Sequence, residues 1–443
     1  MPASATWSAN LTETEHRSQL RRAVLASTIG TTIEWYDFLL YGTMAALVFG
    51  KLFFPKSTPI IGVLESFGVF FVGFVGRPIG AAIFGHFGDR IGRKATLIVT
   101  LLVTGIATVA VGCVPSYASI GVWGAVLMTL IRLVQGIGVG GEWGGSVLLA
   151  MEWAGTDKNR GFLSSWPQFG APAGLFLANC AVLAFSWLSG DQFMVWGWRI
   201  PFLLSSIMVV VGLWIRLGIM ETPVFQKVID EERIERAPVW EVLKRQPKQV
   251  LLTALLRMPE QAPGYIVGAW IFSYGTLVLG FSRNFLLIAV ITQTVLGFLW
   301  VTVAGHLSDR IGRKNMYMLG ALFMGVFGFV YIAMLNTQIP WVVFLAVAFS
   351  LVPVMTQYGP EAALIAESFT PRLRYSGCSL GYQLASLIAG GPSPFIATWL
   401  FATYHSAWPI AVYIAICAII GIVATAMLTD YTNKAIATEY AGV

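Results

Sequence analysis

The sequence predicts an all-α membrane protein with twelve transmembrane helices, arranged as two pseudo-symmetric six-helix halves. Three observations support this prediction. The chain of 443 residues is 56% hydrophobic and only 11% charged, whereas soluble domains carry about 25% charged residues. Lys and Arg gather in alternate loops. A ten-residue motif also occurs twice, half a chain apart.

Twelve apolar segments are long enough to cross a bilayer, which needs roughly 20 predominantly apolar residues. They run approximately over residues 23–50, 60–84, 95–113, 121–151, 162–188, 200–219, 249–279, 284–306, 316–335, 341–366, 377–401 and 407–429. In lipid a spanning segment must satisfy its backbone hydrogen bonds within the protein, which leaves helices or a closed barrel. The continuous apolar run Val195–Gly218 lacks the alternation of a barrel strand, so helices are expected.

The loop charges predict the orientation of these helices. About twenty Lys and Arg fall in the two tails and the even-numbered loops. The opposite side holds Lys51, Lys56, Arg199 and Arg283. Because positive charge accumulates in cytoplasmic loops, both termini are expected in the cytoplasm.

A repeat divides the chain into halves. Gly85–Lys94 recurs as Gly305–Lys314, with eight of ten positions identical at an offset of 220 residues. Two halves related by a parallel repeat place a substrate site between them, near the middle of the membrane. The expected parts are a cytoplasmic tail over 1–21, an N-terminal half over 22–219, a cytoplasmic linker over 220–247, a C-terminal half over 248–430 and a cytoplasmic tail over 431–443.

The repeated loop resembles the signature of the major facilitator superfamily. Further stretches are similar to its metabolite:proton symporter family, namely Glu34–Gly42, Arg132–Gly145, Trp196–Phe202, Arg374–Gly377 and Gly381–Ser386. That family includes carriers of shikimate, 2-oxoglutarate, citrate, and proline or betaine. The resemblance implies the major facilitator fold in a bacterial inner membrane. It also implies a monomeric symporter that imports a small metabolite with protons by alternating access.

Ionisable residues inside the spans are costly, so each is a candidate for function. They are Glu34, Asp37, Glu65, Arg77, Arg132, Glu142, Arg257, Glu260 and Glu361. Arg216 is expected near a helix end, with its charge reaching the membrane surface.

Asp37 and Arg132 are the first candidates for proton coupling. A carboxylate beside a guanidinium stays ionised, and loss of that partner frees it to take a proton. In related porters an acid in the first helix pairs with this Arg of the fourth helix, and the resemblance implies the same pair here. Glu34 and Glu142 compete for the titrating role. The alternative is a static ion pair that holds two helices together.

Arg257 is the leading candidate for contact with a substrate carboxylate, because a planar guanidinium suits bidentate carboxylate binding. Pro259 and Pro263 remove backbone donors nearby and indicate an irregular helix that lines a cavity. The spacing of Arg257 and Glu260 is similar to that in shikimate carriers. The alternative is that these two side chains neutralise each other, and Arg77 is the second candidate.

Polar and aromatic residues of other spans are expected to complete the substrate site. These candidates are Trp35, Tyr36, Gln168, Tyr358, Tyr382 and Gln383. A small carboxylate is the expected substrate. A zwitterion such as proline or betaine remains an alternative, as does proton-driven export of a small molecule.

The repeated loops also carry candidate gates. The two expected cytoplasmic ion networks are Asp89 and Arg93 with Glu152, and Asp309 and Arg313 with Glu367. Exposed ion pairs contribute only about 0–1 kcal/mol each, but several together bias an equilibrium between two states. Such networks would hold the cytoplasmic side closed.

Other function classes are disfavoured. The four His residues are dispersed, so no metal site is expected, and the four Cys residues are expected to be packed thiols. No GxxxxGK[ST] motif occurs, which argues against an ATP-driven pump. We therefore expect a transporter and not an enzyme, with no cofactor and no nucleic-acid partner. Its partners are a small-molecule substrate, protons and membrane lipid, and the proton gradient drives it.

Overall fold

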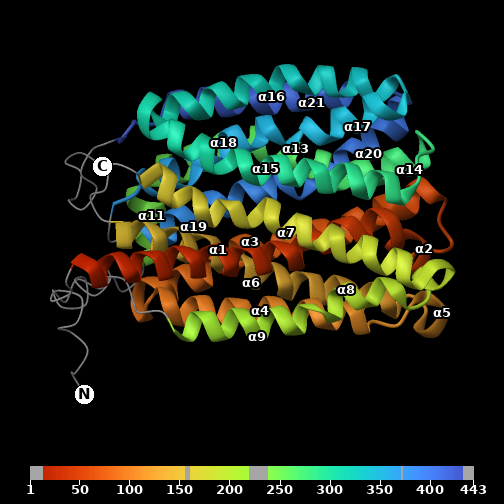
Figure 1. Cartoon of the computed structure of the whole chain (residues 1–443), viewed down its shortest axis with the longest axis horizontal. Coiled ribbons are helices and arrows are strands. Elements are labelled where there is room, and N and C mark those ends of the chain that lie inside the picture. Colours follow the sequence, from red (N-terminus) through yellow and green to blue (C-terminus); the bar gives the residue numbers. More distant parts are fainter. Residues whose placement is uncertain (1–12, 155–159, 219–237, 371–372, 433–443) are drawn as a thin grey trace.

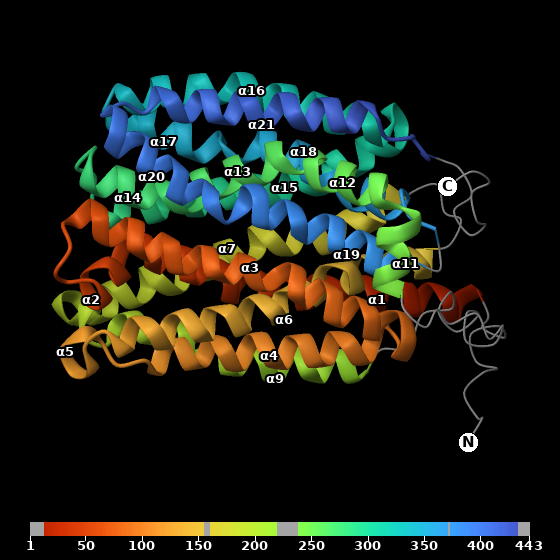
Figure 2. The same cartoon turned by 180° about the vertical axis from the view of Figure 1, so that it is seen from behind.

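A computed structural model describes residues 13–154, 160–218, 238–370 and 373–432 of the chain. Within these ranges the regular secondary structure is entirely helical. The long helices run side by side along the longest axis of the molecule (Figure 1, Figure 2). The predicted all-α class is confirmed.

Eleven of the described helical stretches are long and apolar enough to cross a membrane. They comprise α1 (Glu13–Met44) with η1 (Ala45–Phe49) and α2 (Gly50–Phe53), α3 (Pro59–Ile91), α4 (Arg93–Cys113), α6 (Trp123–Ala154), α7 (Arg160–Ser189) with η2 (Gly190–Met194), η3 (Gly197–Arg199) with α8 (Ile200–Leu203) and α9 (Ser205–Leu217), α15 (Arg283–Ile311), α16 (Arg313–Asn336), α17 (Pro340–Phe349) with α18 (Leu351–Ala366), α19 (Arg374–Ala385) with η5 (Ser386–Gly390) and α20 (Pro392–Tyr404), and α21 (Trp408–Ala426). Two short helices, α5 (Tyr117–Ile120) and α11 (Pro238–Arg245), lie outside them.

The twelfth expected span is broken into pieces and is not among those eleven. It consists of α12 (Pro247–Leu256), α13 (Met258–Tyr265), η4 (Ile266–Trp270) and α14 (Ile271–Leu277). The interruption between α12 and α13 falls at Arg257. Pro259 and Pro263 lie in α13 and cannot donate backbone hydrogen bonds. The prediction of an irregular seventh span is therefore confirmed, and the whole is consistent with the twelve-helix fold.

The helices form two groups that meet along the long axis. In Figure 1 the helices up to residue 217 lie mainly in the lower part and those from residue 247 in the upper part. The groups meet where α7 packs against α15 and α3 packs against α19. Both α1 and α4 begin and α21 ends at one end of the bundle, here called the terminal face. The opposite end, which carries α2, α5 and α14, is called the distal face.

The repeated motif forms the same turn in both groups. α3 and α4 are separated only by Gly92, and α15 and α16 only by Gly312. These glycines have φ angles of 112° and 93°, a region that side chains disfavour. The repeat in the sequence therefore encodes two equivalent sharp reversals at the terminal face.

Glycine contact also sets the distance between α3 and α6. A Cβ atom on Gly136 would lie 1.8 Å from the carbonyl oxygen of Gly73, so only glycine permits this approach. The close contact brings Arg77 of α3 and Arg132 of α6 towards the same ring, that of Phe38 on α1.

Candidate functional site

A central cavity of about 60 Å³ lies between the two groups of helices. Its lining is mostly apolar and comes from α1, α7, α13, η4 and α18. The polar residues among the lining are Glu260, Gln261, Tyr265 and Tyr358, and Trp35 adds an indole ring. Ligand pockets usually measure roughly 300–1,000 Å³. In this structure the cavity therefore has room for only a few water molecules.

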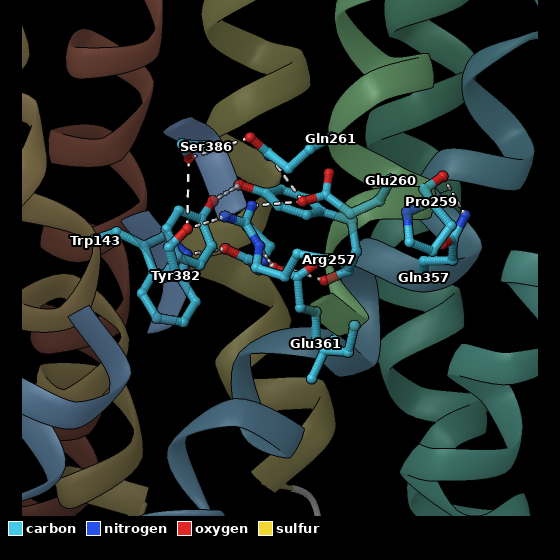
Figure 3. Close-up of polar contacts among 12 residues, drawn as sticks. Trp143, Arg257, Pro259, Glu260, Gln261, Gln357, Glu361, Tyr382 and Ser386 are labelled. Atoms are coloured by element: carbon cyan, nitrogen blue, oxygen red, sulfur yellow. Dashed lines mark hydrogen bonds and ion pairs between the residues drawn. The ribbon is translucent and has the colours of Figure 1, made fainter. Parts of the chain in front are cut away.

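Arg257 is fully buried behind this cavity and does not line it. Its Nε donates to Glu361 Oε1 at 2.6 Å, and its Nη2 donates to Glu260 Oε1 at 2.5 Å. Its Nη1 donates to the carbonyl oxygen of Tyr382 at 2.6 Å. Figure 3 shows this guanidinium surrounded by its three partners. The structure thus shows the ion pair between Arg257 and Glu260 that was the alternative to substrate contact. Every nitrogen of Arg257 already has a partner within the protein.

Glu361 is the partner that the sequence analysis did not assign. It was recognised only as an ionisable residue inside a span. The structure joins it to Arg257, which is 104 positions away in the chain. A charged residue in an apolar segment indicates a candidate functional residue, and Glu361 could be found in this way. No pattern in the sequence indicates which distant charged residue it contacts.

Three predicted residues form a connected chain across the middle of the molecule. The hydroxyl groups of Tyr358 and Tyr382 are hydrogen-bonded at 2.9 Å. The Tyr382 ring stacks on Trp143, with 3.7 Å between centroids. Trp143 Nε1 donates to Gln168 Oε1 at 2.8 Å, and Gln168 Nε2 donates to the carbonyl oxygen of Tyr358 at 3.1 Å. The chain links α6 and α7 to α18 and α19, but only Tyr358 among its members lines the cavity.

Two predicted members of the site point elsewhere. The Tyr36 hydroxyl donates to the carbonyl oxygen of Pro201 at 2.5 Å, in α8. Gln383 Nε2 lies 3.4 Å from the carbonyl oxygen of Gly140, in α6. Both side chains therefore bridge helices away from the cavity, and neither lines it. Neighbouring positions on a helix point about 100° apart, so Trp35 lines the cavity while Tyr36 does not.

Arg77 does not line the cavity either, but a short chain of hydrogen bonds links it to the cavity wall. Its Nη1 donates to Ser386 Oγ at 3.3 Å, while its Nε and Nη2 have no hydrogen-bond partner. Ser386 in turn donates to Gln261 Oε1 at 3.2 Å, which connects Arg77 to the cavity wall. The Tyr265 side chain is another part of that wall and lies within electrostatic reach of Arg77. The guanidinium packs against the ring of Phe38, with Arg77 Cζ 3.8 Å from the ring centroid.

The expected ion pair between Asp37 and Arg132 is absent. Asp37 Oδ1 accepts a hydrogen bond from Ser205 Oγ at 2.5 Å, and Oδ2 has no partner. Arg132 stacks 3.8 Å from the centroid of Phe38 and donates to Gln135, while its Nε and Nη2 have no partner. Because Asp37 and Phe38 are adjacent on a helix, they point in different directions. Arg132 meets the aromatic face of α1, and the Asp37 carboxyl faces α9.

The other two candidate acids lie in different surroundings. Glu142 forms an ion pair with Arg216 and also accepts from Thr100 Oγ1 at 2.8 Å. Arg216 was expected to reach the membrane surface, and this was wrong, because its side chain is buried against Glu142. Glu34 is also buried, with one carboxyl oxygen that has no partner. It lies within electrostatic reach of Arg77 and Arg216.

The ion network expected in the second repeat is present at the terminal face. Arg313 forms ion pairs with Glu367 and, at 3.1 Å, with Asp309. All three side chains are buried, not exposed as expected, because α7 covers them. Asp309 accepts backbone hydrogen bonds from Gly161 and Phe162 at the start of α7, both at 2.9 Å. This carboxylate therefore ties the two groups of helices together, which the sequence did not indicate.

The counterpart network of the first repeat lies outside the described residues, since the side chains of Asp89, Arg93 and Glu152 are not described. A different bond joins the groups at this level. The Tyr375 hydroxyl of α19 donates to the carbonyl oxygen of Gly141 in α6 at 2.7 Å. The terminal face is thus closed at more than one place.

A wider cavity opens at the distal face. It measures about 470 Å³ and is lined by residues of η1, α2, η2 and the ends of α3, α14 and α15, together with the connection between α2 and α3. Lys51 and Arg283 contribute to the lining, and no Asp or Glu is among the residues described there. We call this cavity the distal vestibule. Its position and the closed terminal face show a molecule that is more open at its distal face.

Comparison with known proteins is consistent with this architecture. Residues 23–248 match the family described as Sugar (and other) transporter, and residues 144–370 match the family described as MFS/sugar transport protein. The chain is 39% identical over 420 residues to the inner membrane metabolite transport protein YhjE of Escherichia coli (strain K12), which covers 93% of this chain and 94% of that protein. It is also 39% identical over 418 residues to the shikimate transporter of the same organism, covering 93% and 95%. A solved structure of the proton:xylose symporter XylE, bound to 6-bromo-6-deoxy-D-glucose, shares the fold with a TM-score of 0.75, 19% identity and coverage of 95% and 98%.

Proposed function

The chain belongs to the major facilitator superfamily of membrane transporters, and on this basis we propose that it is a proton-coupled symporter that imports a small carboxylate metabolite. One relative is named as a transporter of shikimate, a hydroxylated carboxylate, and XylE is a proton:xylose symporter. We place the chain in a bacterial inner membrane, as for the relative YhjE. The terminal face is assigned to the cytoplasm, because Lys and Arg gather in its loops.

The observation that carries the carboxylate assignment is the unused hydrogen-bonding capacity of Arg77. A buried guanidinium with two nitrogens that have no partner is costly. A substrate carboxylate can accept two parallel N–H bonds from such a group. The hydroxyl of Tyr265, which lines the cavity, can donate to the same carboxylate. Since Arg257 has no unengaged nitrogen, we assign the carboxylate contact to Arg77, which the sequence suggested only as the second candidate.

The remaining polar groups of the cavity suit a hydroxylated substrate. Glu260, Gln261 and Tyr358 converge on the cavity from α13 and α18. A carboxylate oxygen, an amide and a phenol can each bond a substrate hydroxyl. Because the cavity holds only about 60 Å³ in this state, the halves must separate before a metabolite enters.

We assign the transported proton to Asp37. Its side chain is fully buried, and among the described residues it forms no ion pair. An isolated buried carboxylate is costly, and protonation removes that cost. Ser205, which donates to Asp37 Oδ1, can hydrogen-bond either form of the carboxyl group. Glu34, three residues away on the same helix, is the alternative proton carrier.

During alternating access, the closed terminal face would open and the open distal face would close. In this structure Asp309 bonds the start of α7 at the terminal face, while the distal vestibule is open. We propose that this is an outward-facing state with a closed central site. Release of Gly161 and Phe162 from Asp309 would accompany the change to an inward-facing state, as expected for two halves that rock about a central site.

A zwitterionic substrate is the second candidate, and one observation favours it. Glu260 is the only charged residue among those that line the central cavity. Its carboxylate would attract an ammonium group, while Arg77 bound the carboxylate of the same molecule. A substrate such as proline or betaine would satisfy both.

Transport by the purified protein in proteoliposomes tests these proposals. An inward proton gradient should drive accumulation of one or more labelled carboxylates, and a protonophore should abolish it. Protein-free liposomes and a reversed gradient are the controls. Accumulation confined to zwitterions would favour the second candidate. Extrusion against the same gradient, or uptake that ignores the gradient, would contradict proton-coupled import.

A further inference from the structure

Two carboxyl groups meet at one guanidinium in the middle of the C-terminal helices. Glu361 and Glu260 bond Arg257 at 2.6 Å and 2.5 Å. The Arg257 and Glu361 side chains are completely buried, and that of Glu260 is 5% exposed. Both carboxyl groups bond neighbouring nitrogens of one guanidinium, Nε and Nη2, and therefore share a single cation. This cluster, Arg257 with Glu260 and Glu361, is called the carboxyl pair.

A hydrogen bond between two carboxyl groups requires a proton, because ionised carboxylates only accept. Glu361 Oε2 has no hydrogen-bond partner in the described structure, and a proton on either carboxyl group would give the pair the donor that it lacks. One guanidinium and two ionised carboxylates would also leave one uncompensated negative charge in a buried site. Like charges that share such a site are relieved when one of them takes a proton.

Among the described residues around the carboxyl pair, none supplies a second cation. The titratable groups that face the carboxyl pair are the hydroxyls of Tyr265 on α13, Tyr317 on α16, Tyr358 on α18 and Tyr382 on α19. Tyr413 and Cys417 of α21 pack against Met258 and Ala262 of α13. All of these groups are ordinarily uncharged. The next cation, Arg77, is connected to Glu260 only through Ser386 and Gln261.

We propose that Glu260 and Glu361 share a second transported proton, separate from the one assigned to Asp37. This inference rests on the proposed function, since it concerns what is carried with the substrate. Glu260 lines the central cavity and Glu361 does not, so the proton is exchanged with water through Glu260. The second proton binds to one carboxylate of the pair when the cavity opens to the distal face. It leaves as a free proton when the cavity opens to the terminal face, where water can solvate the second negative charge.

The second proton changes the electrical character of transport. A monocarboxylate that enters with one proton carries no net charge, whereas entry with two protons moves one positive charge inwards. Uptake by the native protein should therefore respond to membrane voltage as well as to the pH gradient. Glu361→Gln keeps the size of the side chain, and its amide can still donate to Glu260 and accept from Arg257. It removes only the shared proton.

The experiment measures the charge moved per substrate in proteoliposomes, with equal pH on both sides and a potassium diffusion potential, negative inside. The native protein is expected to accumulate substrate under voltage alone. In Glu361→Gln the charge per substrate should fall by one, while a pH gradient still drives uptake. Glu260→Gln should cause the same fall. Glu241→Gln, which removes a charge from a surface pair with Arg245, is the matched control and should change nothing.

Equal charge per substrate in the native protein and in both carboxyl-pair variants would overturn the inference. Infrared spectroscopy gives a second readout that needs no transport. A protonated-carboxyl band that persists in Asp37→Asn should disappear in Glu260→Gln and Glu361→Gln, and its absence from the Asp37→Asn protein would also overturn the inference. By contrast, failure of the native protein to accumulate any substrate under a proton gradient would contradict the proposed function, whatever the infrared band shows.

Discussion

The buried arginines of the N-terminal helices and of the C-terminal helices differ in their interactions. Arg77 and Arg132 lie on either side of the Phe38 ring, each 3.8 Å from its centroid, and each keeps two nitrogens without a partner. Arg257 has a partner for every nitrogen, two of them carboxylates. Aromatic faces stabilise a guanidinium without using its donors. The N-terminal arginines are therefore held in place with donors free for a ligand, whereas Arg257 is neutralised inside the protein.

The acids show the same contrast. Asp37 has one oxygen bonded by Ser205, another without a partner, and no ion pair. Glu260 and Glu361 both form ion pairs with Arg257, although Glu361 Oε2 also has no partner. Unsatisfied groups in a buried site are costly unless something else binds them. The comparison assigns the substrate carboxylate and the proton of Asp37 to the N-terminal side of the cavity, and only the second proton to the C-terminal side. Four predictions test it, in order of decreasing effect.

Replacement of Asp37 by Asn has the largest expected effect. The variant keeps a hydrogen bond to Ser205 but cannot take up a proton at this position. Uptake driven by the proton gradient should fall by up to about 100-fold, because a coupling group inside the membrane is lost, and the uptake that remains is expected to depend on Glu260 and Glu361. Exchange of labelled for unlabelled substrate at equal pH should be retained. Parallel measurements of net uptake and exchange check this. Normal gradient-driven uptake would transfer the role to Glu34.

Arg77→Lys and Arg257→Lys should separate the two kinds of arginine. Lys keeps the charge but loses the planar fork, so Arg77→Lys should raise KM for a carboxylate about 10–100-fold, equivalent to the roughly 1.5–3 kcal/mol of charged hydrogen bonds. Arg257→Lys should instead lower the free energy of unfolding by about 3–5 kcal/mol, because it breaks a buried ion network. Initial uptake rates and thermal unfolding of both proteins measure these effects. A large KM increase in Arg257→Lys with normal stability would reverse the comparison.

Asp309→Asn tests the one place where a C-terminal carboxylate binds the N-terminal helices. The variant weakens the bonds to Gly161 and Phe162, and each hydrogen bond to a charged group contributes about 1.5–3 kcal/mol. The inward-facing population should rise by about 10-fold or more. Labelling of a cysteine introduced at Ser165, which packs against Gly305 in the closed state, measures the opening. Unchanged labelling relative to the parent cysteine variant would show that Asp309 does not hold the terminal face closed.

The smallest effect is expected at the distal vestibule. Lys51 and Arg283 line it, and positive clefts raise the local concentration of anions. Lys51→Gln should raise KM for a carboxylate about 2–3-fold at low salt and less at high salt, because ions screen exposed charges. Lys56→Gln is the control, since Lys56 stacks on Tyr117 outside the vestibule. If the two substitutions raise KM equally, the increase is caused by the overall surface charge and not by the vestibule.

Much of the fold was predictable because membrane helices obey a simple constraint. Lipid forces long apolar helices with paired backbones, so all twelve spans were predicted from hydrophobic length, and the irregularity of the seventh from its prolines. The same rule identified Asp37, Arg77, Arg132 and Arg257 as candidates, since charges rarely occur in lipid. Their partners could not be predicted in this way. Helix rotation turned Asp37 towards Ser205 and Tyr36 towards Pro201, and a change of about 100° in direction separates one neighbour from the next.

By itself, the sequence determined the helical membrane class, the positions of the spans and the repeat with its two glycine turns. These properties follow from local composition and from the solvent that each segment must face. Only the tertiary structure decided which charges meet. It paired Glu361 with Arg257 and Glu142 with Arg216, and left Arg77 with unused donors. The physical reason is that electrostatic contacts in a buried site depend on distances of a few ångströms between helices far apart in the chain, and local sequence does not encode those distances.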